Sequence, residues 1–525
     1  MIDAVIGEAL TGAGIAVPDR RIVSKAKRLR EVDAVIDMRD FTEGERDAVG
    51  ASVVAALGDV ALVADASFAD PFVGLRFDAP ALRTLVCDTV LRHGEAYGAG
   101  TVGDGRCLHV QFSSPNLNKA LHVGHLRNNF LGMALSRIVA NQGYEVLRLE
   151  APANHGRHIS RAVVAYLLWS TTADPRAAAM KPDHFVQSWY VRFNDEWEAA
   201  SEDERRRLED LVAEVTRRQH RGDDPALTAV WRTLTEWAYD GIRGTYRRIG
   251  TSFDVAFRED ESLPASEAAV LAGLGTTCFR RDDGSVYIEV GEGDDVRQAT
   301  LLRGDGTPVL CAQYLGISLR RQALYPGFGL LNIMGREYVD RVPELVRTLE
   351  ALGAASVAAR HEVVFHAHVT LPEGRMRSRD GSSITADDAL DVARAGMAER
   401  LRRHTDDTVA VDDLAETLAV ALLKLHFLRR PVDRDVTWDE AGLWRETFPR
   451  FLRLFEAFAT VEWRAWRAPA SEHEGGDGCC TPLLVHLETF PDVARRAFDE
   501  RDPVSLVHFL EGLVEHVATS PCRSH

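Results

Sequence analysis

Two histidines and a glycine lie close together in the segment Lys119-Ala120-Leu121-His122-Val123-Gly124-His125. Neutral or charged imidazoles at this spacing could hydrogen-bond phosphate oxygens. Gly124 would let a nucleotide approach the backbone closely, and Lys119 adds a positive charge just upstream. The residue types therefore favour a phosphate-binding site. Taken alone, however, the short pattern is more typical of a surface histidine pair that only begins a helix.

The elements around this segment favour the first interpretation. Cys107–Phe112 is an apolar strand-like run, and Ser113–Asn116 has the composition of a turn. Apolar residues then keep one helical face from His125 to Asn141, Gly143 is placed to end that helix, and Tyr144–Leu149 is a second strand-like run. Strand, helix and strand in this order predict a parallel sheet. The histidines would stand where backbone N–H groups and the helix dipole attract anions.

The rest of the chain alternates between helical and strand-like patterns. Residues 160–250 are helical and highly charged, which is typical of a helical insertion with solvated faces. Residues 386–458 are helical almost throughout, and 468–478 has the composition of a linker. Between residues 250 and 386 we expect a helix at 343–352 and strands at 285–290, 300–302, 330–334 and 361–371.

Composition excludes several classes of protein. The 525 residues carry a net charge of −17, which argues against a general positive surface for nucleic acid or anionic membranes. The seven cysteines form no C-x-x-C pair, so we expect neither a disulfide framework nor a zinc ribbon. The start of the chain lacks a signal-peptide pattern, and Asp59 and Asp65 interrupt the longest apolar region. We therefore expect a cytoplasmic protein that acts without a membrane.

The segment 113–149 resembles the nucleotide-binding signature of class I aminoacyl-tRNA synthetases, and its residue pattern is most similar to that of the arginyl-tRNA synthetases. Other segments resemble that family in the same order. The match covers roughly residues 65–525 and includes the segments 156–159, 181–185, 302–307 and 371–381.

The resemblance implies a fold and a domain order. The fold class is α/β, with a Rossmann-type catalytic domain, an N-terminal α+β add-on domain and a C-terminal all-α domain similar to those that bind anticodons. The expected boundaries are 1–105 for the add-on domain, 106–385 for the catalytic domain with a helical insertion at about 165–265, and 386–525 for a truncated helical domain.

The resemblance also implies a reaction, in which an amino acid and ATP, with Mg²⁺, give an aminoacyl adenylate and pyrophosphate. His122 and His125 would stabilise the charge that builds on the phosphates. Arg375, Arg377 and Arg379 would close over pyrophosphate where the family usually has lysine, and Lys119 would compensate for a weaker loop. Gly124, Gly335, Glu337 and Met376 would bind ATP.

The amino-acid pocket departs from the family pattern. An arginine site must neutralise a guanidinium, because a buried unpaired cation is costly. Gln111 replaces a family glutamate, and the alignment places Leu310 at a family tyrosine, Tyr314 at a family aspartate and Tyr338 at a family glutamine. Ser113 and Asn116, near the expected amino-acid head group, are kept. A one-residue slip in the alignment of 300–340 would change these assignments but not that of Gln111.

Three hypotheses follow from these residues. The first is a ligase that activates an amino acid other than arginine and transfers it to a small amine, a peptide or tRNA. The second is a genuine arginyl-tRNA synthetase. The third, a non-catalytic binding module, is disfavoured because Lys119 and the two histidines remain together. We expect a monomer and no resident metal, although His361, His366 and His368 left metal binding open as an alternative.

Overall fold

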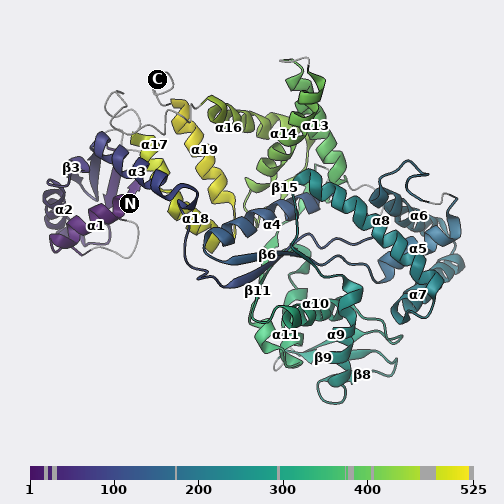
Figure 1. Cartoon of the computed structure of the whole chain (residues 1–525). Helices are drawn as coiled ribbons and strands as arrows, with labels where there is room; N and C mark the ends of the chain where they lie inside the picture. Colours follow the sequence, from purple (N-terminus) through teal and green to yellow (C-terminus); the bar gives the residue numbers. More distant parts are fainter. Residues whose placement is uncertain are drawn as a thin grey trace. The chain divides into compact units, whose positions relative to one another are not determined.

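The computed structural model describes residues 1–16, 22–25, 32–171, 174–291, 296–372, 374–375, 384–403, 407–460 and 481–519 (Figure 1). The chain forms two compact units. The first contains residues 1–100, 449–500 and 505–525, and the second contains residues 101–448 and 501–504. The expected phosphate-binding segment lies in the second unit.

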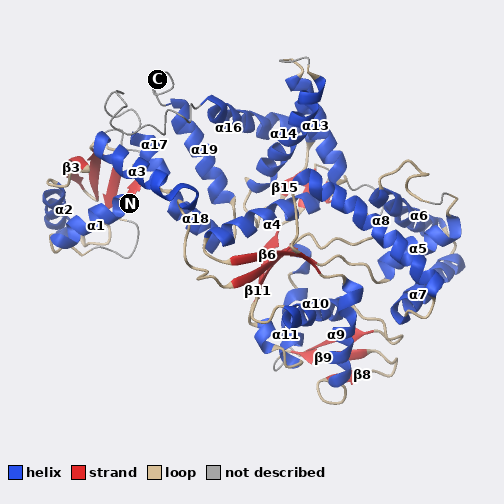
Figure 2. Ribbon diagram, viewed as in Figure 1, coloured by secondary structure: helices blue, strands red, loops and turns tan. Residues whose placement is uncertain are grey.

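The second unit is built on a five-stranded parallel sheet (Figure 2). Its strand order is β12-β11-β5-β6-β7, so the chain enters in the middle and fills both sides. The sequence pattern predicts the parallel sheet itself. The strands are β5 (Cys107–Gln111), β6 (Glu145–Glu150), β7 (Val255–Ala256), β11 (Gly329–Gly335) and β12 (His361–His366). The carboxyl ends of β5 and β11 meet, because Gln111 pairs in register with Asn332.

Helix α4 (Val123–Asn141) packs across β5, β6 and β11. Leu126, Phe130 and Leu135 are fully buried on it, which explains its apolar face. The helix begins at Val123, two residues earlier than the apolar pattern indicates, because His122 serves as its N-cap. Gly143 follows the helix with φ +87°, in the left-handed region that glycine adopts readily.

The part of the chain that connects β6 to β7 is helical, as the charged pattern predicts. They are α5 (Arg157–Trp169), α6 (Pro182–Ala199), α7 (Glu202–Arg221) and α8 (Pro225–Ile249). After β7, helix α9 (Glu259–Ala272) leads to a small antiparallel sheet of β8 (Cys278–Arg280), β9 (Val286–Val290) and β10 (Arg297–Leu302). Helix α10 (Leu310–Leu324) then packs against α9 and returns the chain to β11.

The sequence prediction of one strand over 361–371 is wrong. The run divides into β12 and β13 (Val369–Leu371), which belong to different sheets. Ala367 N donates to Val432 O, and Val369 pairs in parallel with Val436 of β15 (Val436–Thr437). The chain leaves the main sheet at Ala367 because a distant segment offers it a second set of partners. β13 also pairs with β14 (Gly374–Arg375).

The remaining elements of the second unit follow β11 and β14. The turn η3 (Arg336–Tyr338) and helices α11 (Arg341–Ala351) and α12 (Ala355–Ala358) connect β11 to β12. Beyond β14 lie α13 (Ala386–Leu401), α14 (Thr408–Leu428), α15 (Glu440–Gly442) and the π-helical turn η4 (Leu443–Thr447). The sequence places the expected helix at 343–352, close to the observed α11.

The first unit combines an antiparallel sheet with helices. Its sheet has the order β1-β2-β4-β3, and its apolar core includes Ile6, Leu57 and Leu75. Its strands are β1 (Val23–Lys25), β2 (Ala34–Asp37), β3 (Val63–Ala69) and β4 (Phe72–Phe77). Its helices are α1 (Ile2–Gly12), α2 (Glu43–Leu57), α3 (Ala79–His93) with the turn η1 (Gly94–Ala96), α17 (Thr481–Glu488) and α18 (Phe490–Asp499), with most of α16 (Phe448–Thr460) and α19 (Val504–Thr519). Among the described helices, none combines the length and apolar character needed to cross a membrane.

Candidate active site

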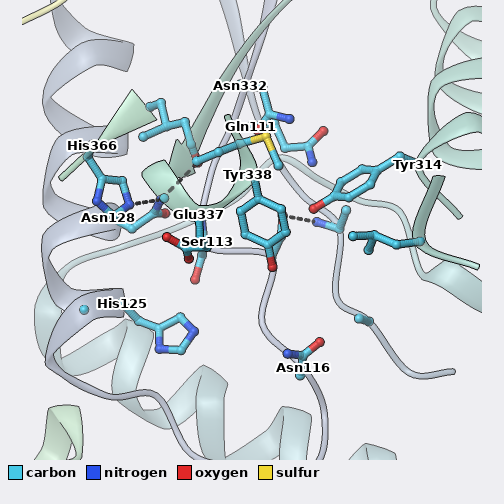
Figure 3. A pocket seen from close by; sticks show the side chains of 18 of the residues that line it. Gln111, Ser113, Asn116, His125, Asn128, Tyr314, Asn332, Glu337, Tyr338 and His366 are labelled. Atoms are coloured by element: carbon cyan, nitrogen blue, oxygen red, sulfur yellow. Dashed lines mark hydrogen bonds between the residues drawn. The ribbon is translucent and has the colours of Figure 1, made fainter. Parts of the chain in front are cut away.

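The predicted site residues within the described chain converge on one cavity of about 430 Å³ at the carboxyl ends of β5 and β11 (Figure 3). Its walls come from the turn after β5, the start of α4, the start of α10 and the turn after β11. The predicted residues that line it are Gln111, Ser113, Asn116, Lys119, His122, Gly124, His125, Leu310, Tyr314, Gly335, Glu337 and Tyr338. Residues more than 200 positions apart in the sequence thus meet in one place.

The second predicted loop lies largely outside the described residues. Arg375 is described only through its backbone in β14, and Met376, Arg377 and Arg379 fall in the undescribed part. Their assigned roles therefore stay predictions.

The two histidines form the N-terminal cap of α4. The ring of His122 accepts a hydrogen bond from Gly124 N at 3.1 Å, and Nδ1 of His125 accepts one from His122 N at 3.1 Å. A nitrogen that accepts from an amide cannot carry the proton, so each neutral ring holds its proton on Nε2. The ring centroids lie 4.0 Å apart. The cap therefore fixes two imidazoles in the orientation needed for a pair of Nε2–H donors.

Both rings are neutral at physiological pH. Burial, with a smaller contribution from Lys119, lowers the pKa of His122 to about 3. Burial, with the neighbouring His122 and Lys119, lowers the pKa of His125 well below its ordinary value. Burial also lowers the pKa of Lys119. A neutral imidazole in a sheltered site can donate a hydrogen bond to an anion without a solvent shell to remove first.

Two glycines that line the cavity lie in close contact with neighbouring side chains. A Cβ atom on Gly124 would lie 2.8 Å from Cε1 of His122, and one on Gly335 would lie 2.3 Å from Oε2 of Glu337. Both distances are shorter than normal van der Waals contacts, so a side chain would displace the neighbouring groups. The absence of Cβ atoms therefore leaves room for the His122 ring and the Glu337 carboxylate in the cavity wall.

The turn after β5 is held in an unusual conformation. Ser113 and Ser114 have φ values of +64° and +46°, which non-glycine residues rarely adopt, and such a conformation costs on the order of 1–3 kcal/mol per residue. Side chains from other elements maintain it. Asn129 Nδ2 donates to Ser113 Oγ at 3.0 Å, Ser113 Oγ lies 2.8 Å from the hydroxyl of Tyr246, and Tyr246 donates to Glu150 Oε2 at 3.0 Å. This network positions Ser113 at the cavity wall, and Asn116, which forms a β-bridge with Ala153, lines the same cavity.

The side chains expected around the substrate side chain carry no charge that could pair with a guanidinium. Gln111, which is 3% exposed, lines the cavity together with Leu310, Tyr314 and Tyr338. The rings of Tyr314 and Tyr338 meet edge to face with centroids 6.5 Å apart. Burial raises the pKa of both phenols, so both are neutral.

Glu259, at the start of α9, is a carboxyl group of the cavity that sequence reasoning missed. Its Oε2 accepts a hydrogen bond from His155 N at 3.2 Å, and burial raises its pKa to about 8. At neutral pH it is therefore mainly protonated. Glu337, the other acidic residue among the described lining residues, is exposed and lies 3.7 Å from His368 Nδ1. The only sequence signal for Glu259 is its place in an acidic first helical turn.

The missed lining residues are mostly polar and come from elements distant in the sequence. Asn128 Nδ2 donates to Ile333 O at 3.0 Å and lies 3.1 Å from Nε2 of His366, whose Nδ1 lies 2.9 Å from Ala367 O. His366 is thus held by hydrogen bonds in the wall of the cavity (Figure 3). The complete set of missed polar lining residues is Ser114, Asn128, His158, Glu259, Gln313, Asn332, His366 and His368.

The start of α13 is fixed beside the histidines. Ala386 N donates to Leu121 O at 2.7 Å, and Val123 N donates to Ile384 O at 3.2 Å. Lys181 Nζ and Arg248 Nη1 donate to the carboxylate of Asp387 at 2.6 and 2.9 Å. Burial opposes ionisation of Asp387, but hydrogen bonds from His184, Lys181 and Arg248 outweigh it and hold its pKa well below the usual range.

Asp183, His184 and Asp387 form the one group of described residues whose ligand atoms are close enough to share a metal ion. Lys181 Nζ already lies 3.0 Å from Asp183 Oδ2 and 2.6 Å from Asp387 Oδ2. The ammonium group therefore balances the two carboxylates, and we assign this cluster an anchoring role. His361, His366 and His368 do not belong to such a group in the described chain.

Glu259→Gln is expected to flatten the pH dependence of the free energy of unfolding. The pKa of Glu259 is about 8 in the folded state against an ordinary 4.5, so its contribution to stability is fully present below pH 4.5 and is lost as the pH rises to about 8. The loss amounts to about 1.4 kcal/mol per pH unit. Chemical denaturation at pH 6 and pH 8.5 measures it. Glu289→Gln, at an exposed position of β9, is the control. Equal pH slopes in Glu259→Gln and the unmodified protein would contradict the burial argument.

Comparison with known proteins agrees with this geometry. The family model described as tRNA synthetases class I (R), catalytic domain, matches residues 87–426. An arginine–tRNA ligase from Treponema pallidum is 32% identical over 455 residues, which cover 84% of this chain and 76% of that protein. An arginine–tRNA ligase from Treponema denticola is 27% identical with the same coverage.

The fold resembles solved structures as well. The arginyl-tRNA synthetase of Thermus thermophilus superimposes with a TM-score of 0.72 and 20% identity, over 98% of this chain and 90% of that one. This likeness confirms the predicted fold class, with its parallel-sheet catalytic domain and helical C-terminal region.

Proposed function

Because the chain belongs to the class I tRNA synthetases of the arginine family, and is therefore a ligase, we propose that it activates an amino acid as an aminoacyl adenylate. We further propose that this amino acid is not arginine. The observation that carries the second statement is the uncharged wall formed by Gln111, Tyr314 and Tyr338. A guanidinium in this cavity would find Glu259 protonated and Glu337 at the exposed rim.

The proposed reaction uses the two ends of the cavity differently. A carboxylate oxygen of the amino acid attacks the α-phosphorus of ATP, and the bond from that phosphorus to the pyrophosphate oxygen breaks. His122 and His125 donate from Nε2 to phosphate oxygens, so their contribution grows with the negative charge. Ser113 and Asn116 lie where they would orient the amino-acid head group. Mg²⁺ would arrive on the phosphates of ATP, which suits a cavity with few carboxylates.

A genuine arginine–tRNA ligase is the second candidate. The names of the similar proteins favour it, and the comparisons taken alone support it better than the first. On this account Glu259 would lose its proton when a guanidinium binds, since an adjacent cation favours the carboxylate form. The two candidates also differ in the acceptor of the acyl group, which is tRNA for an arginine–tRNA ligase and either tRNA or a smaller amine for the first candidate. A monomeric state, a cytoplasmic location and the domain boundaries predicted from the sequence stay predictions.

The reaction class is tested by ATP–pyrophosphate exchange with a broad amino-acid panel in the absence of tRNA. The proposal expects exchange that depends on one amino acid or a narrow group of them. Addition of tRNA, and separately of hydroxylamine as a small acceptor, then shows whether the acyl group is transferred to either. Absence of exchange with the whole panel, with and without tRNA, would contradict adenylate formation.

Asp387→Asn is expected to lower kcat for exchange about 10-fold with little change in KM for the amino acid. Its carboxylate fixes the start of α13, which follows the predicted pyrophosphate loop, and loss of a charge-assisted hydrogen bond costs about 1.5–3 kcal/mol. Steady-state exchange kinetics measure the effect. Asp391→Asn is a matched control on the same helix, because its exposed carboxylate also binds Arg248. A rise in KM without a fall in kcat would assign Asp387 a different role.

A further inference from the structure

A second cavity adjoins the candidate active site at its amino-acid end. It has a volume of about 420 Å³ and is formed by β10, the start of α10, β11 and the start of α11. Both cavities are lined by Leu310, Tyr314, Asn332, Met334 and Tyr338. None of the histidines at the phosphate end lines the second cavity. In Figure 3 Tyr314 lies across the first cavity from His125. The two spaces therefore meet where the side chain of the amino acid would lie.

The charge of this second cavity is positive. Its ionised lining groups are the guanidiniums of Arg303 and Arg341 and the carboxylate of Glu344. Arg341 and Glu344 lie 3.6 Å apart, and the Arg341 side chain is 65% exposed. Arg303 Nη1 donates to Thr307 Oγ1 and Pro308 O, both at 3.2 Å, and this guanidinium has no ion pair within the described chain. Burial lowers the pKa of Arg303, which shows that its charge is partly removed from water.

The backbone adds to this field. Helices α10 and α11 begin at the cavity wall, and neither has a side-chain hydrogen bond at its N-cap. The first-turn N–H groups of a helix carry partial positive charge. Two further acidic residues lie close in the chain but do not line the cavity: Asp340, the N-cap of α11, and Asp305, whose charge acts on Arg303. A half-buried guanidinium that has no ion pair among the described residues is costly, and an anionic ligand would reduce that cost.

We propose that the second cavity receives the side chain of the activated amino acid and that this side chain ends in a carboxylate. The proposal rests on the proposed function, because it assigns the substrate class of the same site. It accounts both for the uncharged side chains of Gln111 and Tyr314 and for the arginines of the second cavity. Besides Glu259, the acidic residue among the described lining residues of the first cavity is Glu337, whose side chain is 56% exposed to water. Arg303 and Arg341 lie beyond it in the second cavity. Glu259, protonated at neutral pH, does not oppose an anion.

The test compares amino acids that differ in length and terminal charge. Isothermal titration calorimetry of the full chain uses L-glutamate, L-2-aminoadipate and L-2-aminopimelate, with L-glutamine, L-norleucine and L-arginine as neutral and cationic comparisons. We expect one of the three dicarboxylic amino acids to bind most tightly. Arg341→Gln is expected to weaken that binding about 10- to 100-fold, the scale of one lost charge-assisted hydrogen bond. Binding of norleucine and of ATP should not change.

The variants separate charge from folding. Arg303→Lys keeps a positive charge and should retain most of the binding, whereas Arg303→Gln should lose it. Arg347→Gln, on the same helix as Arg341 but exposed and outside both cavities, is the matched control. A dicarboxylic series that binds no better than norleucine, or binding that Arg341→Gln and Arg303→Gln leave unchanged, would overturn the proposal.

ATP–pyrophosphate exchange distinguishes this inference from the proposed function. If dicarboxylic amino acids bind through the two arginines but support no exchange, adenylate formation fails and the inference stands. If exchange occurs only with neutral or cationic amino acids, adenylate formation stands and the inference is overturned. If no member of the panel binds, the inference is overturned as well.

Discussion

His125→Ala is expected to lower amino-acid-dependent ATP–pyrophosphate exchange by about 100-fold or more. The ring is half-buried and neutral, and its Nδ1 is occupied by His122 N, so Nε2–H is the donor left for the phosphates. Removal of one preorganised donor to a developing negative charge typically costs 10²- to 10³-fold in rate. Exchange kinetics at saturating ATP and amino acid measure the loss in kcat.

Folding must be separated from catalysis in this variant, because His125 also belongs to the helix cap. Loss of a capping contact costs about 1 kcal/mol, so a modest fall in melting temperature is expected. His125→Asn, which keeps a hydrogen-bonding side chain at the cap, should recover stability but not the exchange rate. His508→Ala, at an exposed position of α19, is the control for histidine removal. An exchange rate within a few-fold of that of the unmodified protein would remove the assigned role.

The double substitution Gln111→Glu with Tyr314→Asp is expected to raise exchange with arginine by about 100-fold. Gln111 is buried at the end of β5, and Tyr314 faces the same cavity, so two carboxylates there would supply the partners that a guanidinium requires. The smaller aspartate also makes room for the longer substrate. Charge-assisted pairs of this kind contribute about 1.5–3 kcal/mol each when desolvated.

The control for that experiment keeps the shape and removes one charge. Gln111→Glu with Tyr314→Asn opens the same space with one carboxylate fewer, so it should show a smaller gain. Equal gains in the two double variants would attribute the effect to volume rather than charge. A loss of exchange with all amino acids, in a protein that still folds and binds ATP, would show that Gln111 and Tyr314 act in activation itself.

The parts of the site that are contiguous in the chain could be predicted from the sequence. The turn at 113–116 and the segment 119–125 lie where strand and helix patterns change, and such local signals survive folding. The parallel sheet follows from the βαβ pattern and the Rossmann-type domain from the family resemblance, but the order of the strands is known only from the structure. The N-cap role of His122 was missed, because histidine is not among the usual capping residues and the apolar pattern begins later.

Contacts between distant segments could not be predicted from local patterns. Glu259 and Asn332 reach the cavity because β7 and β11 flank the same central strands, which no short window of sequence reveals. The division of 361–371 into two strands depends on partners near Val432 and Val436. The second cavity likewise arises from the packing of α10 and α11 beside β10, and its residues show no pattern in the chain.

The most direct measurement of the central claim is the ratio of kcat/KM in ATP–pyrophosphate exchange for arginine and for the best other amino acid. We propose that His122 and His125 form the phosphate end of the cavity and that the pocket around Gln111 and Tyr314 does not bind a guanidinium. It predicts that exchange occurs and that arginine is at least about 100-fold poorer than the best substrate, the scale of an unpaired buried charge. Arginine as the best substrate of the panel would contradict it and would establish the arginine–tRNA ligase alternative for this pocket.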